Sequence, residues 1–166
     1  MEFVHLHVHS EYSFLDGAIG VEALVNKAAE LGMKSVAVTD HGNLCGAYAF
    51  YTAATEAGIR PILGIEAYIS PTHRKDKSMG RQETAAYHII LLAVSTEGWR
   101  NLMKLSTRSF TEGFYYKPRV DRELLAEFGK GIVCCSACLG GEIPAAIIAG
   151  NEEKAKKIAG EYADIF

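Results

Sequence analysis

The sequence lacks the features that direct a chain to a membrane or out of the cell. Its start, Met1-Glu2-Phe3, has no basic region followed by an apolar core, and no apolar run approaches the length of a membrane span. We therefore expect a cytoplasmic protein without membrane contact. An excess of positive charge is also lacking, because 20 Asp and Glu against 17 Lys and Arg give a formal net charge of -3. Any contact with nucleic acid must therefore be local or supplied by a missing partner.

A disulfide framework is not indicated either. Four cysteines in a chain without an export signal indicate reduced thiols rather than a disulfide framework.

The sequence contains neither Gly-x-Gly-x-x-Gly nor a Walker A sequence, so a phosphate-binding turn of the Rossmann or P-loop type is not indicated. We find no repeats and no low-complexity tract. With 49% hydrophobic residues, 166 residues suffice for one domain or a large part of one.

The chain does contain an alternation of strands and helices. Apolar runs predict strands at 4–10, 35–39, 61–69, 88–94 and 132–135. Helical spacing and capping residues predict helices at 21–31, 43–58, 97–110, 121–128 and in two segments up to 166. This order predicts a parallel sheet of right-handed βαβ units. We favour a barrel over a doubly wound sheet, because candidate ligands follow several strand ends, where barrel enzymes build their sites.

The most unusual pattern lies in the first ten residues, where Val4-His5-Leu6-His7-Val8-His9 alternates apolar residues with histidines. Successive side chains of a strand point to opposite faces, so the three histidines would share one face. Two imidazoles can converge on one metal ion, and His is the commonest metal ligand. The alternative is a half-exposed strand whose polar face is merely histidine. This stretch by itself leaves the choice open.

Several other polar residues are hard to place in an apolar core. With the histidine repeat they form the list His7, His9, Asp16, His41, Glu66, His88 and Cys138. Glu66 is the hardest to dismiss, because a carboxylate inside an apolar strand is costly unless it is paired or binds a cation. The others have plain alternatives: a turn at Asp16, a cap at His41, a strand end at His88, a small core side chain at Cys138, or a Cys135-x-x-Cys138 redox pair. Their joint placement in successive strand-helix units favours a metal site.

At these residues the sequence resembles the PHP (polymerase and histidinol phosphatase) family, over nearly its whole length. The matching stretches are 5–10, 12–17, 39–42, 64–66, 88–92, 112–119 and 136–144. The last two separate the N-terminal PHP domains of bacterial replicative DNA polymerases from free-standing histidinol phosphatases. The resemblance is therefore to the polymerase group within the family.

The resemblance implies an α/β fold, a distorted (β/α)7 PHP-type barrel that is here truncated before its last strands. Residues 1–166 would be the N-terminal part of the PHP domain, with its C-terminal end missing. The family's closing Asp-x-His follows a further strand and is not among the 166 residues. Because only about five strands can be read, we expect exposed sheet edges, an oligomer or a poorly stable fragment, and incomplete binding of at least one ion.

The resemblance also implies a multinuclear metal site. The family's ligands fall on His7, His9, Asp16, His41, Glu66, His88 and Cys138. His5 is not expected to be a ligand, and Asp40 is expected to orient an imidazole. Mixed N, O and S ligands exceed the needs of one tetrahedral ion, so we expect two or three divalent ions, with Zn, Mn or Fe as open choices.

Such a site supports phosphoester hydrolysis, because clustered divalent ions lower the pKa of a bound water and hold the phosphate oxygens. The resemblance implies a phosphoesterase or 3′–5′ exonuclease site within a nucleotidyltransferase of DNA replication. Its partners would be DNA, the other polymerase domains and replisome subunits. Two alternatives stay open: a stand-alone phosphatase such as histidinol phosphatase, and a non-catalytic domain with a structural metal.

Local positive charge occurs in two segments. Residues 70–86 are the most basic part of the chain, and residues 114–119 mix aromatics with cations. We expect both to lie toward the ligand-bearing rim and to contact DNA phosphates or neighbouring polymerase domains. The candidate DNA-binding residues are Arg74, Lys75, Lys77, Lys117 and Arg119.

Overall fold

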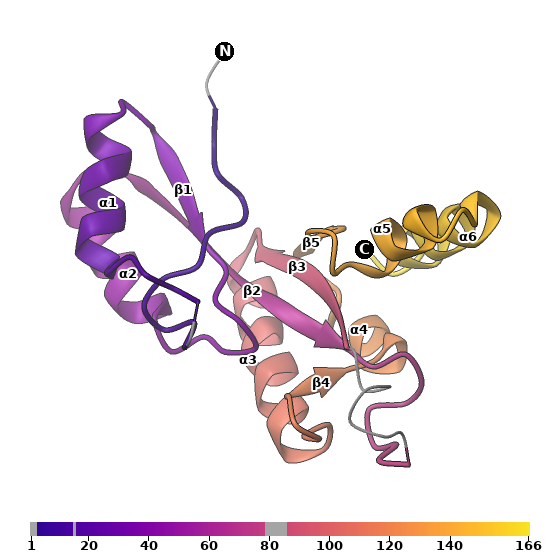
Figure 1. The fold of residues 1–166 in the computed structure, drawn as a ribbon. Coiled ribbons are helices and arrows are strands. Elements are labelled where there is room, and N and C mark those ends of the chain that lie inside the picture. The colour runs from indigo at the N-terminus through magenta and orange to yellow at the C-terminus, as the bar shows by residue number, and fades with distance from the viewer. Residues whose placement is uncertain (1–2, 15, 79–85) are drawn as a thin grey trace.

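The long strand β2 (Arg60–Ile69) is the centre of the fold, because three other strands pair with it. The computed structural model describes residues 3–14, 16–78 and 86–166 (Figure 1). In chain order the other elements are α1 (Val21–Glu30), β1 (Ser35–Val38), α2 (Ala47–Glu56), β3 (Tyr87–Ala93), α3 (Thr96–Thr111), β4 (Arg119–Val120), α4 (Arg122–Phe128), β5 (Ile132–Cys135), α5 (Glu142–Ile148) and α6 (Glu152–Ala163). None of the helices in these residues is long and apolar enough to span a membrane.

The strands form a mixed sheet in the order β1-β2-β3-β5, with β4 paired to the end of β2. The first half of β2 pairs in parallel with β1, with Val38 opposite Leu63. Its second half pairs antiparallel with β3, with Glu66 opposite Ile90. β4 is parallel to β2, and β5 is antiparallel to β3. Among the described strands, β3 therefore runs against all the others.

The predicted all-parallel sheet is thus wrong at β3. Parallel neighbours need a crossover connection, usually a helix, and the described part of the connection from β2 to β3 contains none. The reversal brings the start of β3 beside the end of β2, where His88 lies opposite Tyr68. A histidine at the start of a strand thereby joins the strand ends at which barrel sites form.

The predicted first strand, residues 4–10, is extended but is not part of a regular strand. It lies beside β1, where the Ala37 N–H donates to the His5 carbonyl (2.9 Å) and the Thr39 N–H to the Val8 carbonyl (2.8 Å). Between these two bonds the β1 side advances by two residues and the extended segment by three, which is the one-residue excess of a β-bulge. The excess breaks the predicted alternation, so His5 lines a surface pocket together with Val8 and does not share a face with the next two histidines.

Apolar side chains cover both faces of the sheet. On the outer face, Ile65 and Leu91 belong to the largest core cluster with Leu102 of α3 and Leu124 of α4. β1 packs separately against α1 and α2 through a second cluster around Phe50. Because side chains alternate along a strand, Glu66 lies on the opposite, inner face of β2.

The inner face carries a smaller apolar cluster of Ala37, Ile90 and Leu92. Part of this face is open, as a pocket of about 440 Å³ that includes Leu6 and Val133 in its lining. Both of these side chains are more than 40% exposed. The polar part of the inner face is where the predicted site residues meet.

Candidate metal centre

The site is built around Glu66, whose side chain is fully buried in the middle of β2. Its backbone is fixed on the side of β1, because the Glu66 N–H donates to the Asp40 carbonyl (3.1 Å) and the Glu66 carbonyl accepts from the Gly42 N–H (2.9 Å). These two bonds continue the pairing of β1 with β2 and bring His41 next to Glu66. The local backbone therefore sets the position of the carboxylate and of its nearest histidine together.

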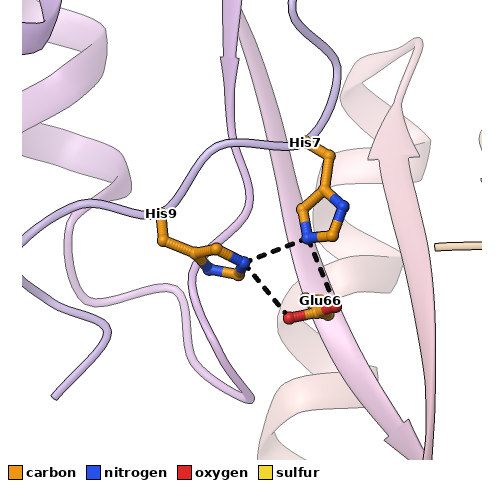
Figure 2. Close-up of side chains that lie close together, drawn as sticks. All are labelled: His7, His9 and Glu66. Carbon is orange, nitrogen blue, oxygen red and sulfur yellow. Dashed lines mark hydrogen bonds and ion pairs between the residues drawn. The ribbon is translucent and has the colours of Figure 1, made fainter. Parts of the chain in front are cut away.

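Four histidine rings surround the Glu66 carboxylate. His7 Nε2 lies 3.2 Å from Oε1 and His9 Nε2 lies 3.3 Å from Oε2, both reaching over from the extended N-terminal segment (Figure 2). His41 Nδ1, just after β1, is 2.6 Å from Oε2. His88 Nδ1, near the start of β3, is 3.1 Å from Oε1. Residues far apart in the sequence thus meet at one carboxylate.

The other two predicted ligands lie at the edge of this group. Asp16 Oδ2 is 2.8 Å from His41 Nε2. Cys138 Sγ, in the loop after β5, is 3.9 Å from Glu66 Oε1 and 3.8 Å from His88 Nδ1. All seven predicted ligands therefore form one connected group, the Glu66 cluster: His7, His9, Asp16, His41, Glu66, His88 and Cys138. That they bind metal stays a prediction.

The donor atoms of the Glu66 cluster fit a cation better than they fit one another. The atoms of His7, His9 and Glu66 lie within 4.8 Å of one another, and so do those of His41, Glu66 and His88. His41 Nδ1 and Glu66 Oε2 are buried and have no hydrogen-bond partner in the described structure, although only 2.6 Å separates them. Two acceptor atoms this close need a cation between them, and either a proton on His41 or a shared metal ion would supply it. Imidazole, carboxylate and thiolate donors suit Zn, Mn or Fe.

Electrostatics in the Glu66 cluster favour the metal-binding protonation states of Glu66 and His9 and oppose that of His41. Burial acts to raise the pKa of Glu66, but the close imidazoles of His41 and His88 outweigh it and hold that pKa well below its usual range. Burial, aided by the neighbouring His41, lowers the pKa of His9. The adjacent Glu66 carboxylate raises the pKa of His41. Metal ligands must be ionised carboxylates, neutral imidazoles and thiolates, so the raised pKa of His41 means that a bound ion would have to compete with a proton there.

A hydrogen-bonded group of Asp40, Ser10 and Ser13 lies behind the histidines. Asp40 is buried and accepts from the Ser10 N–H (2.7 Å), the Ser10 hydroxyl (2.8 Å) and the Ser13 hydroxyl (2.7 Å). Because Ser13 Oγ gives its hydrogen to Asp40, it accepts from His9 Nδ1–H at 3.2 Å and from the His41 backbone N–H at 3.1 Å. This leaves the lone pair of His9 Nε2 directed at the Glu66 carboxylate.

Asp40 was predicted to orient an imidazole. In the described residues it does not contact the His9 ring directly but accepts a hydrogen bond from Ser13, whose hydroxyl oxygen contacts His9 Nδ1. Sequence reasoning missed both Ser10 and Ser13 as site residues. The available signal is their spacing, Ser10-x-x-Ser13, directly after the histidine repeat.

The alternative of a Cys135-x-x-Cys138 redox pair is not supported. Burial raises the pKa of Cys135, and burial raises the pKa of the neighbouring Cys134 to about 12. Reactive thiols show the opposite shift. Cys138 instead faces Glu66 and His88.

Two of the predicted DNA-binding residues are buried, with 2% exposure for Arg74 and 0% for Arg119. Arg74 pairs with Asp121 (2.9 Å) and with Glu112 (2.9 Å), and Arg119 donates to three backbone carbonyls. Their guanidinium groups are therefore used inside the protein, and the prediction that they contact DNA is wrong in this fold.

The other three candidates, Lys75, Lys77 and Lys117, are exposed, and for them DNA contact stays a prediction. Part of the basic segment 70–86, namely 79–85, lies outside the described residues.

Comparison with known proteins places these features in a family. The family model of the PHP domain matches residues 5–166. DNA polymerase III subunit alpha of Borreliella burgdorferi is 49% identical over 154 residues, which cover 93% of this chain and 13% of that protein. DNA polymerase III subunit alpha of Treponema pallidum is 46% identical over 166 residues, covering 100% of this chain and 14% of that protein. Among solved structures, an amidohydrolase from Chromobacterium violaceum matches with a TM-score of 0.46 and 26% identity, covering 75% of this chain and 34% of that one. The chain thus spans less than a sixth of the length of these curated relatives.

Proposed function

The chain belongs to the PHP domain family, and on this basis we propose that it is a metal-dependent phosphoesterase of the 3′–5′ exonuclease type within a bacterial replicative DNA polymerase. The observation that carries this proposal is the buried Glu66 carboxylate. It contacts four imidazoles and a thiol, and within the described residues it contacts no Lys or Arg. A buried anion with no lysine or arginine beside it calls for a cation.

The proposed ligands divide into two groups that share Glu66. His7 and His9 would hold one ion with Glu66, and His41 and His88 a second. Asp16 and Cys138 lie beside these groups and would supply further bonds, so we propose two or three divalent ions of Zn, Mn or Fe. Bound divalent ions lower the pKa of a coordinated water and stabilise the charge of the phosphate.

This chain's own residues have three tasks in such a site. Ser13 fixes the tautomer of His9, and Asp16 faces the outer nitrogen of His41. The carboxylate of Glu66 holds the two ligand groups at one separation, because it is anchored in the middle of a paired strand. A fixed separation is what a multinuclear phosphoesterase site requires.

The polymerase context supports DNA as the substrate. The curated relatives quoted above are DNA polymerase III alpha subunits, and their identity to this chain extends over 93% to 100% of it. We therefore propose DNA, the other domains of the polymerase and replisome subunits as partners. Nucleotidyl transfer is not proposed for the residues described.

Elemental analysis combined with a hydrolysis assay tests the proposal. The protein is loaded with Zn²⁺ or Mn²⁺, and its metal content is measured before it is given 5′-labelled single-stranded DNA or histidinol phosphate. We expect at least one bound ion, release of nucleotides from the 3′ end, and loss of this activity in a chelator. A preference for histidinol phosphate would identify a small-molecule phosphatase instead. Bound metal without hydrolysis of either compound would identify a structural site.

A further inference from the structure

Lys117 is an exposed lysine that lies close to the Glu66 cluster. Its Nζ is 4.3 Å from the centroid of the Tyr68 ring, the distance of a cation–π contact. Tyr68 follows Glu66 by two residues on β2 and therefore lies on the same inner face. Its ring stacks on His41, with centroids 5.9 Å apart, and meets His88 edge-on at 5.3 Å. The ammonium group and two proposed ligand rings thus contact the same tyrosine.

The backbone holds Lys117 in this place through a tight turn. The Tyr115 N–H donates to the Lys117 carbonyl (3.1 Å), and Tyr116 between them has a φ of 59°. A left-handed φ is uncommon for a bulky residue that is not glycine, and such strain persists only where the surroundings impose it. The buried guanidinium of Arg119 anchors the segment before the turn, because its Nε donates to the Gly113 carbonyl (3.1 Å).

The turn also packs tightly against the segment that carries His41. A Cβ placed on Gly42 would lie 2.9 Å from Pro118 and 2.9 Å from the Tyr68 ring, so a larger residue would push the turn away. Pro118 is the neighbour of Lys117, and Gly42 is the neighbour of His41. The position of Lys117 is therefore coupled to the position of the metal centre.

The charge of Lys117 is not used inside the protein. Among the described residues it forms no ion pair, in contrast to Lys75, Lys130 and Lys156, whose Nζ atoms lie 2.9 to 3.7 Å from glutamate oxygens. A lysine that is positioned by a strained turn and has no anionic partner has its ammonium group free for an anion from outside.

We propose that Lys117 binds the phosphate group of the substrate at the metal centre. This inference rests on the proposed function and adds to it the residue that recognises the phosphate. Lysine binds phosphate as a point charge on a flexible stem, so Nζ can leave the face of Tyr68 and reach an oxygen of a phosphate held over His41 and His88. The substrate class is a nucleoside phosphate or a DNA phosphodiester.

The test measures binding of thymidine 5′-monophosphate, a product of the proposed reaction, to the Zn²⁺-loaded protein by calorimetry. We expect Lys117→Ala and Lys117→Gln to weaken binding about 10-fold, and Lys117→Arg to restore most of it. The metal content should stay equal to that of the wild type in all three variants. Lys117→Gln keeps a polar side chain with part of the aliphatic stem, and Lys117→Arg keeps the charge, so the contrast between these two variants reports the charge rather than the packing.

Lys104→Ala is the matched control, because Lys104 is also exposed and its Nζ lies 5.2 Å from the ring of Phe128, on the outer face of the sheet. It should bind the nucleotide as the wild type does. Wild-type affinity in Lys117→Ala with a full metal content, or equal losses in the two lysine variants, would overturn the role of Lys117 and leave the proposed function standing. A wild-type protein that binds no Zn²⁺ would overturn both.

Discussion

Two regions of this molecule bury carboxylates, and they satisfy them in different ways. The Glu66 cluster surrounds one carboxylate with imidazoles and a thiol. The arginine network consists of Arg74, Arg108, Glu112, Arg119 and Asp121, and there each carboxylate faces a guanidinium. Asp121 accepts from Arg74 Nη1 (2.9 Å), and Glu112 accepts from Arg74 Nε (2.9 Å). The protein supplies fixed guanidinium charges in the arginine network, whereas in the Glu66 cluster the carboxylate faces only titratable histidines and a thiol.

The comparison explains why only one of the two regions is a candidate metal site. His73, Asp121 and Glu123 also bring ligand atoms within 4.8 Å of one another. Arg74 Nη1, however, lies 2.9 Å from Asp121 and 3.4 Å from Glu123, so a fixed cation already occupies this group. A second cation would be repelled there. Proximity of carboxylates and histidines therefore indicates a metal site only where no arginine neutralises them.

Exchanging a glutamate for glutamine in each region is the sharpest test of this difference. Glu66→Gln removes the charge that both ligand groups share, and we expect it to weaken metal binding by more than about 100-fold, since residues that merely support ligands cost about 10- to 100-fold. Competition with a chelator, followed by elemental analysis, measures the change. Glu112→Gln is the matched control and should leave the metal affinity unaltered. Equal metal affinity in the two variants would remove the distinction between the regions.

The arginine network should control stability instead of metal binding. Arg74→Met leaves the buried Asp121 without its arginine, while Glu112 keeps Arg108, so we expect the free energy of unfolding to fall by about 2–4 kcal/mol, at unchanged metal affinity. Urea unfolding of the metal-free protein measures this fall. Lys75→Met is the control, because Lys75 is exposed and only 3.7 Å from the same Glu112, where an ion pair contributes less than about 1 kcal/mol. A similar loss in both variants would mean that burial does not set the strength of these pairs.

A smaller effect is expected from the serine that supports the histidines. Ser13→Ala removes the acceptor for His9 Nδ1–H and the hydroxyl that donates to Asp40, so metal affinity should fall about 10-fold. Chelator competition again gives the value. Ser95→Ala removes the N-cap of α3, where Ser95 accepts from the Gly98 N–H, and should cost about 1 kcal/mol of stability without changing metal affinity. If Ser13→Ala lowered only stability, its contact with His9 would have no part in the site.

How much of this could be predicted from the sequence depends on the kind of information needed. The seven residues of the Glu66 cluster could be chosen because polar groups inside or just after apolar strands need a partner, and the structure brings all seven together. Their role as ligands stays a prediction. The reversal of β3 could not be predicted, because the buried run Ile89-Ile90-Leu91-Leu92 is equally apolar in either direction.

Two other errors have the same origin, which is that partners distant in the sequence are invisible in a local pattern. Arg74 and Arg119 lie in segments whose composition is typical of exposed loops, yet both are buried. The burial depends on partners more than 40 residues away along the chain, which are Asp121 for Arg74 and the carbonyls of residues 74 and 76 for Arg119. Likewise, the alternation that placed His5 beside His7 assumed a regular strand, and the extra residue opposite β1 removed that regularity.

The acid dependence of stability provides the last test, because it assigns part of the stability to a single carboxylate of the arginine network. Burial acts to raise the pKa of Asp121. Hydrogen bonds from the backbone N–H groups of Arg74 and Leu124, together with the charge of Arg74, outweigh this effect. The pKa of Asp121 is therefore lower in the folded protein than the value of about 3.9 in the unfolded chain. A depressed folded pKa means that the stabilising contribution is fully present above the unfolded pKa and is lost as the pH falls through the folded one.

Asp121→Asn retains a side chain that can cap α4 but cannot ionise, so it should be less stable than the wild type by a constant amount above about pH 5. That difference should shrink below about pH 4, where protonation deprives the wild type of the same charge. Urea unfolding measures this difference in the free energy of unfolding, with both proteins metal-free and the pH lowered from 7 to the most acidic buffer that keeps them folded. Because both proteins contain the same Glu66 cluster, the titration of that cluster cancels in the difference. A difference that stayed constant down to the lowest pH would show that Asp121 acts through its hydrogen bonds and not through its charge.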